Sequence, residues 1–156
     1  MSQTSVTGRE AAAVPGLGVV RVAKYTLNAG KLVGGNNIYI ANTTVTLPGP
    51  PLDEGDLILN VLTDCVEVFG DADGGDNTTL QIRFNDGSTQ TDIVAASSIG
   101  GAPFSSVSRV LSVQDFATAG DWLKLTASTR VEVLISNDQN IDDGLLDIYV
   151  LYVSLG

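Results

Sequence analysis

The chain has no histidine, one cysteine and few basic residues, and these shortages exclude several kinds of chemistry. Histidine is the usual general base and the commonest metal ligand at neutral pH. Its absence removes the Ser-His-Asp and Cys-His nucleophile systems and nearly all transition-metal sites. The chain also has only one tryptophan and four tyrosines, too few for an obvious sugar-binding platform. We therefore expect no enzymatic activity, no catalytic residues and no cofactor.

Positive charge is also scarce, which narrows the range of partners. Acidic residues number 18 against 8 basic ones, for a net charge of −10. A surface this negative repels phosphate backbones and anionic lipid headgroups, so we expect neither nucleic acid nor a membrane as a partner. No apolar run approaches the roughly 20 residues that cross a bilayer, and no basic segment followed by an apolar stretch marks a signal peptide. These observations predict a protein made in a cytoplasm.

What the chain does contain is short apolar segments separated by turn-forming residues. Residues 19–27 alternate between apolar and polar side chains, which is the period of a strand. Turn signals recur about every ten residues, a spacing typical of a sandwich or jelly roll. We therefore predict an all-β, jelly-roll-like β-sandwich of roughly eight to ten strands over residues 18–156. The other expected strands cover residues 38–40, 45–47, 56–69, 78–84, 106–113, 122–126, 131–135 and 145–154, and residues 93–99 are expected to form a helical turn.

Two of the expected strands have unusual patterns. In residues 56–69 the apolar side changes near Thr63 and Asp64, which predicts a bulge or a sheet-switching corner there. Cys65 lies in this run, and we interpret it as a small buried hydrophobe because acidic residues, not a base or cation, flank it. Residues 145–153 are apolar on both faces, which is typical of a central strand covered on both sides or of a strand whose outer face enters a subunit interface.

The first 17 residues differ from the rest, since they are mostly small and polar. Such a stretch cannot bury enough apolar area to order itself, so it is either a frayed tail or an extended arm that orders against a neighbouring subunit. We favour the arm, which makes residues 1–17 a separate segment. The expected subunit or partner contacts are Val6, Val14, Pro15, Leu17, Trp122, Tyr149 and Tyr152.

Two acidic loops are the only candidates for binding a metal ion. Asp71, Asp73 and Asp76 lie in a Gly/Asp loop, and hard cations prefer several oxygen ligands around a tight turn. The spacing begins like an EF-hand loop but lacks its final glutamate, and exposed turns use the same residues. Residues 137–144 form a second, weaker candidate. We expect no metal at either loop, and we expect paired carboxylates such as Asp64 and Glu67 to be solvated or ion-paired at an interface rather than catalytic.

Several segments carry a resemblance to a known class of proteins. They are residues 18–20 (GVV), 47–48 (LP), 55–61 (GDLILNV), 66–69 (VEVF), 79–82 (TLQI) and 144–153 (GLLDIYVLYV). In their order the chain resembles virion structural proteins of tailed bacteriophages, most of all jelly-roll capsid decoration (cement) proteins.

The resemblance implies a non-enzymatic protein on the capsid surface of a virion, made in the host cytoplasm. Its expected partners are the major capsid protein or another virion protein, and copies of itself in a homotrimer. The resemblance supplies no catalytic residues. The alternative is a tail, baseplate or fibre-associated β-module, with carbohydrate binding as one option.

Overall fold

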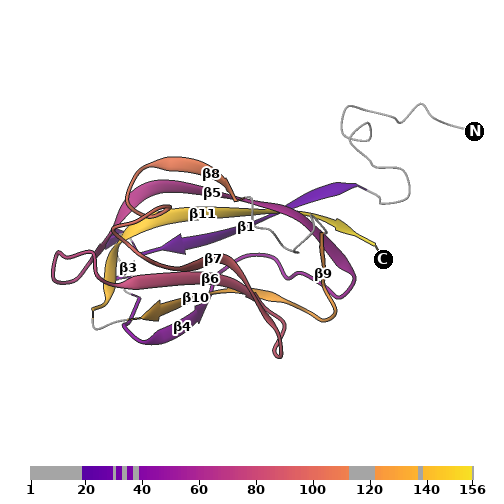
Figure 1. Ribbon diagram of the computed structural model, residues 1–156, viewed down its shortest axis with the longest axis horizontal. Helices are drawn as coiled ribbons and strands as arrows, with labels where there is room; N and C mark the ends of the chain where they lie inside the picture. The colour runs from indigo at the N-terminus through magenta and orange to yellow at the C-terminus, as the bar shows by residue number, and fades with distance from the viewer. Residues whose placement is uncertain are drawn as a thin grey trace, which may run out of the picture.

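The computed structural model describes residues 19–29, 31–32, 35–36, 39–112, 122–136 and 139–155 of the chain. Within these ranges there are two stacked antiparallel sheets and a small hairpin (Figure 1). No helix in the described ranges is long and apolar enough to cross a membrane.

The first sheet has the order β1-β11-β5-β8, and the second has the order β4-β10-β6-β7. The first sheet contains β1 (Val20–Asn28), β11 (Ile141–Ser154), β5 (Asp56–Asp71), β8 (Ser108–Ser112) and the short β9 (Leu123–Lys124), which pairs with β5. The second sheet contains β4 (Thr43–Thr46), β10 (Arg130–Ser136), β6 (Thr79–Asn85) and β7 (Gln90–Ser98). The hairpin pairs β2 (Lys31–Leu32) with β3 (Gly35–Asn36).

This strand order is that of a jelly roll. The first strand, β1, pairs with the last, β11, and β4 pairs with β10, so the chain folds back on itself from both ends. Eight strands of four residues or more make up the two sheets in the described ranges. The prediction of a jelly-roll-like all-β sandwich is therefore confirmed.

The core fills the space between the sheets and follows the alternation of the strands. Along β11, Leu146, Ile148 and Val150 point inward and are fully buried, while the residues between them face outward. Phe69 and Phe104 close one end with an edge-to-face contact, their ring centroids 5.3 Å apart. Burying these side chains is the main stabilising contribution to a sandwich of this size.

β5 changes its inward face, but not where the sequence predicted. Thr63 and Asp64 are in regular register with Ile148 and Asp147 of β11, so the predicted position is wrong. The irregularities lie on either side, where Leu59 and then Val66 are extra residues relative to β11. The cause is visible in the burial pattern: Ile58 points inward before the first bulge, and Val61, Thr63 and Cys65 point inward after it.

Two further differences from the sequence analysis concern short segments. The helical turn expected at residues 93–99 is wrong, because residues 90–98 form β7, which pairs with β6. Among the described strands, β7 pairs on one side only, and its exposed Ala95 and Ala96 lack the alternation of a strand. Its strand conformation comes from hydrogen bonding to β6 rather than from its own pattern. The β2–β3 hairpin was not predicted.

Candidate interaction surfaces

The outer face of the first sheet is the broadest candidate for a contact surface. We use the name outer face for the side chains of this sheet that point away from the core: Val22, Lys24, Thr26, Leu62, Asp64, Arg109, Asp147, Tyr149 and Leu151. The strand register arranges them in rows. Val22 lies beside Leu151 in one row, and Lys24, Tyr149 and Leu62 form the next.

A third row of the outer face carries charge that is neutralised within the face. Asp147 lies beside Asp64, and each has a cation on a flanking strand. The Lys24 Nζ lies 3.0 Å from Asp147 Oδ2, and the Arg109 Nε lies 3.1 Å from Asp64 Oδ2. The hydrogen bond to Asp147 raises the pKa of Lys24, whose ammonium also lies 5.6 Å from the Tyr149 ring centre. The face therefore offers an apolar strip beside charges that are already paired.

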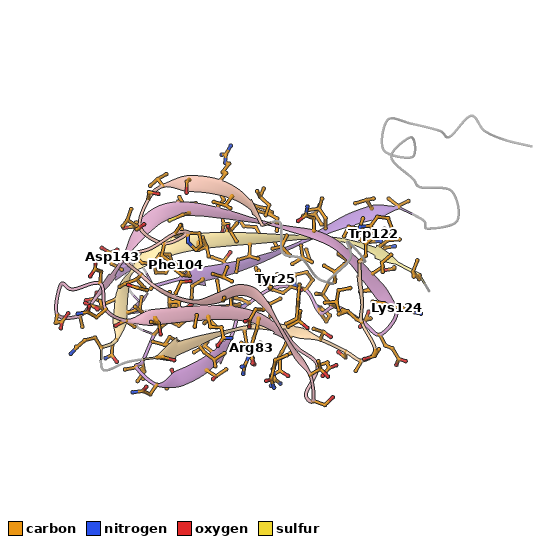
Figure 2. All side chains as sticks on the ribbon, viewed as in Figure 1. Tyr25, Arg83, Phe104, Trp122, Lys124 and Asp143 are labelled. Carbon is orange, nitrogen blue, oxygen red and sulfur yellow. The ribbon has the colours of Figure 1, made fainter. Side chains whose placement is uncertain are left out.

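One end of the first sheet adds exposed apolar side chains. Trp122 is 50% exposed and directly precedes β9, whose Leu123 pairs with Ile58 of β5 (Figure 2). Val19 and Leu155, just outside the ends of β1 and β11, are also exposed. Large apolar side chains gathered at one end of a sheet are typical of a contact surface.

The structure separates the aromatic residues that the sequence proposed as contacts. Tyr149 lies on the outer face, half-buried, whereas Tyr152 packs partly against the core from the same strand. Trp122 lies at the sheet end described above. The other candidates, Val6, Val14, Pro15 and Leu17, lie outside the described residues.

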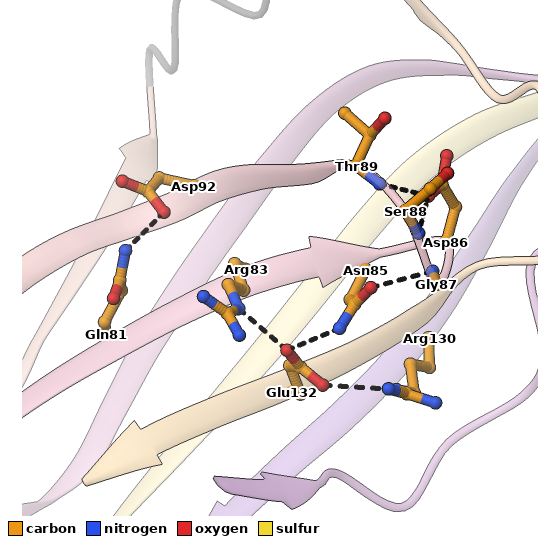
Figure 3. A network of polar contacts seen from close by, with 10 residues as sticks. All are labelled: Gln81, Arg83, Asn85, Asp86, Gly87, Ser88, Thr89, Asp92, Arg130 and Glu132. Atoms are coloured by element: carbon orange, nitrogen blue, oxygen red, sulfur yellow. Dashed lines mark hydrogen bonds and ion pairs between the residues drawn. The ribbon is translucent and has the colours of Figure 1, made fainter.

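The second sheet presents a polar outer surface that is bonded to itself (Figure 3). Glu132 on β10 is 1% exposed, although it lies between Thr46 of β4 and Arg83 of β6 on that surface. Its Oε1 accepts hydrogen bonds from Arg83 Nε at 2.7 Å and Asn85 Nδ2 at 2.8 Å, and its Oε2 accepts one from Arg130 Nε at 3.1 Å.

These donors decide the charge state of Glu132. Burial by itself disfavours the carboxylate, but hydrogen bonds from Arg83, Asn85 and Arg130 outweigh it and lower the pKa. The sequence analysis missed this group. Its one signal was a lone charged residue between Val131 and Val133 in an apolar strand.

The acidic loop between β5 and β6 brings two of its three candidate carboxylates together. Asp71 and Asp73 both face the space beside Gly75, whereas the Asp76 carboxylate packs over Gly100. Burial opposes ionisation of Asp71, but hydrogen bonds with the Asp73 and Thr78 side chains and with the Gly75 and Thr78 amides lower its pKa. Nowhere in the described part of the chain do three histidine, cysteine, aspartate or glutamate side chains group as metal ligands.

The prediction of a second acidic loop at residues 137–144 is wrong in part, because residues 141–144 belong to β11. Residues 137 and 138 are outside the described ranges. Asp143 hydrogen bonds to Glu67 and raises its pKa, as expected for two neighbouring carboxyl groups. Asp64 is ion-paired with Arg109 of the same chain.

Cys65 lies in the core and its thiol is held in place by the backbone. Its side chain is fully buried, with Sγ 3.4 Å from the Glu67 carbonyl oxygen and 3.8 Å from that of Phe104. Burial, followed by the nearby Asp64 charge, raises the pKa of the thiol. A raised pKa disfavours the thiolate, which is the nucleophilic form.

A depression of about 340 Å³ lies at the turn between β6 and β7 and the proline-rich connector after β4. Its polar groups are largely committed to local structure. The Asp86 carboxylate accepts from the Ser88 and Thr89 amides, and the Thr129 hydroxyl donates to the Ala127 carbonyl. A second depression of about 240 Å³, between edge strands β7 and β8, is mainly apolar. These arrangements fit packing and contact better than chemistry.

Comparisons with known proteins give matches among solved structures. One chain from a structure described as the capsid asymmetric unit of cyanophage Pam1 has a TM-score of 0.56 and 21% identity, and the match covers 98% of this chain and 96% of that one. A chain from the capsid of Ralstonia phage GP4 has a TM-score of 0.52 and 15% identity, over 88% and 86% of the two chains. No protein-family model and no curated protein matches. At these identities the likeness establishes a shared fold.

Proposed function

We propose that this chain is a structural protein of a tailed-phage virion, and that it binds the assembled capsid shell as a decoration (cement) protein. The observation that carries the proposal is the fold shared over 98% of the chain with one chain of a phage capsid asymmetric unit. Because the match also covers 96% of that chain, it concerns a whole jelly roll with its connections and not a common fragment. The histidine-free composition agrees with a role in contact rather than catalysis.

The outer face is the surface we assign to docking on the shell. Its apolar strip excludes water on contact, and its ion pairs, Lys24 with Asp147 and Arg109 with Asp64, need no compensation from the partner. The outer surface of the second sheet is polar, so it offers less apolar area to bury against a partner. Shell binding therefore uses the first sheet, with the major capsid protein as the partner.

The stabilising effect of such a protein on the capsid shell follows from mass action. A protein that binds the closed lattice but not the loosened one stabilises the closed lattice by the free energy of that binding. A homotrimer suits this role, because cyclic symmetry presents several docking surfaces at once and leaves no open ends. Residues 1–17 extend the contact area of each subunit.

Reconstitution with heads that lack this protein tests the proposal. Purified chain is added to undecorated heads of the phage that encodes it, and bound copies per head are counted after sedimentation. Saturable binding at a fixed copy number supports the proposal. Absence of binding contradicts it, and glycan binding without head binding would favour the tail or fibre alternative.

A matched pair of variants locates the docking surface. Val22 on the outer face and Ile40 beside β4 of the second sheet are both 59% exposed, so an aspartate is tolerated equally by the fold at either position. Val22→Asp should weaken head binding at least tenfold, because it places a charge in the apolar strip. Ile40→Asp should bind like the unmodified chain. Equal effects of the two variants would contradict the assignment of the outer face.

A further inference from the structure

The loop between β5 and β6 contains a buried oxygen that no group of the protein satisfies. Asp71, the last residue of β5, is 4% exposed. Its Oδ2 accepts a hydrogen bond from the Thr78 hydroxyl at 3.1 Å. Its Oδ1 is buried without a partner, and it is the one such side-chain atom in the described ranges. An unsatisfied buried carboxylate oxygen is costly, which points to a ligand that the chain itself does not supply.

Other oxygen-bearing side chains face the same space. The position that a Cβ would occupy at Gly75 lies 3.5 Å from Asp71 Oδ1, 2.9 Å from Asp73 Oδ1 and 3.8 Å from the Asn77 side-chain nitrogen. Gly75 leaves this space free of a side chain, and its amide donates to Asp73 Oδ1 at 2.9 Å, which fixes that carboxylate.

Two carboxylates directed at one small volume repel each other unless a positive charge lies between them. No lysine or arginine occurs between residues 57 and 82, so the loop and both strands beside it up to Gln81 supply no cation. The ion pairs of the described residues use Lys24, Arg83, Arg109 and Arg130 elsewhere. Within the described residues, no ion pair supplies Asp71 or Asp73 with a positive charge, so a bound cation would balance them.

We propose that this loop binds one hard divalent cation of the Ca²⁺ class through Asp71 Oδ1 and Asp73 Oδ1, with water completing the shell. All-oxygen ligands on an irregular loop suit Ca²⁺, whereas Zn²⁺ prefers nitrogen and sulfur and Mg²⁺ demands a rigid octahedron. Asp76 takes no part, because its carboxylate packs over Gly100. The bound cation ties the end of β5 in one sheet to the start of β6 in the other.

The site belongs to the weak class of calcium sites. The site has only two carboxylate ligands. Calcium sites with so few charged ligands have Ca²⁺ dissociation constants on the order of 10⁻⁴–10⁻³ M, as in extracellular modules. Such a site would be filled at millimolar Ca²⁺, and binding to the folded state alone raises the thermal unfolding temperature.

Calcium titration of the full chain tests this proposal. The unfolding temperature is measured in EGTA and in CaCl₂ up to about 10 mM, a concentration above the expected dissociation constant. Isothermal titration calorimetry gives the stoichiometry. We expect one Ca²⁺ per chain and an unfolding temperature that rises with CaCl₂ but not with NaCl of the same ionic strength. Absence of both the heat and the shift would overturn the proposal, and so would a rise produced equally by NaCl.

Matched variants of the same loop identify the ligands. Asp73→Asn removes the negative charge of one proposed ligand at an exposed position, so the fold should survive, and Ca²⁺ affinity should fall at least tenfold. Asp76→Asn makes the same change of charge three residues away and should leave affinity unchanged. If both variants weaken binding equally, the loop attracts cations only through its overall charge and the assigned ligands are wrong.

Discussion

At the scale of single residues, Glu132 is the clearest case of a charge held by its surroundings. Its two oxygens accept three hydrogen bonds from donors on β6 and β10, so the carboxylate stays ionised although it is buried. Breaking such an arrangement leaves donors unsatisfied, and this usually costs more than the arrangement contributes. The contribution of Glu132 to the free energy of unfolding should therefore vary with pH.

Replacing Glu132 with glutamine should lower the free energy of unfolding at pH 7 by on the order of 1–3 kcal/mol, because the amide nitrogen would face the Arg130 guanidinium. The pH dependence has a definite sign. The folded pKa lies below the ordinary 4.5, so the carboxylate's contribution is full above that pH and is lost as the pH falls through the folded pKa. Urea unfolding at pH 7 and in steps below pH 4.5 measures both effects.

The exposed Glu54 provides the control for that series, since Glu54→Gln makes the same chemical change in a turn. Its unfolding midpoint at pH 7 should match that of the unmodified chain. If Glu132→Gln also unfolds like the unmodified chain at every pH, the network around Glu132 does not stabilise the fold.

Cys65 should behave as a packing residue with an unreactive thiol. Cys65→Ala should lower the free energy of unfolding by on the order of 1 kcal/mol, the usual cost of a small core truncation. A thiol reagent should label the folded chain far more slowly than the urea-unfolded chain, because the thiol is buried and its pKa is raised. Rapid labelling of the folded chain would show that the thiol is accessible.

At the scale of elements, Gly144 in β11 occupies a position that only glycine fits, for two reasons. Its φ is +120°, and a Cβ at this position would overlap the Phe69 ring. Gly87 in the β6–β7 turn has a φ of +96° but open space around it. Gly144→Ala should cost on the order of 3 kcal/mol from strain and overlap, and Gly87→Ala about 1 kcal/mol from strain alone. Equal losses in chemical denaturation would contradict the role assigned to Phe69.

The elements also show what the sequence could and could not predict. Alternation predicted β1 and β6, each of which has one buried face, whereas a run that is apolar on both faces predicted β11. Alternation failed at β7, whose edge position and exposed alanines remove the pattern, and it misplaced the bulges of β5. Bulge positions depend on the register with β11, which is set by a strand about 80 residues away and is not readable from β5 alone.

For the candidate surfaces, too, the sequence predicted some features and not others. Trp122 is exposed and Tyr149 lies on the outer face, and both stay predicted contact residues, chosen as single side chains from their local sequence. The pairing of Asp147 with Lys24, the Glu132 network and the convergence of Asp71 with Asp73 needed the structure. Each joins strands or loop positions that only the folded topology brings together.

At the scale of the whole molecule, residues 1–17 should serve assembly rather than folding. Their composition offers few core residues, so deleting residues 2–14 should leave the melting temperature of the isolated protein nearly unchanged and weaken its binding to heads. Differential scanning calorimetry and head sedimentation measure the two properties on the same preparation. A large fall in the melting temperature would assign the segment to the fold instead.

The central claim is that the protein stabilises a shell, and the resistance of heads to stress tests it most directly. Heads lacking the protein and heads saturated with it are heated, or shocked by rapid dilution from high salt, and DNA release is followed with a dye. The account predicts that decorated heads release DNA at a higher temperature and survive dilution better, because binding favours the closed lattice. Release from bare and saturated heads under identical stress would contradict the cementing role.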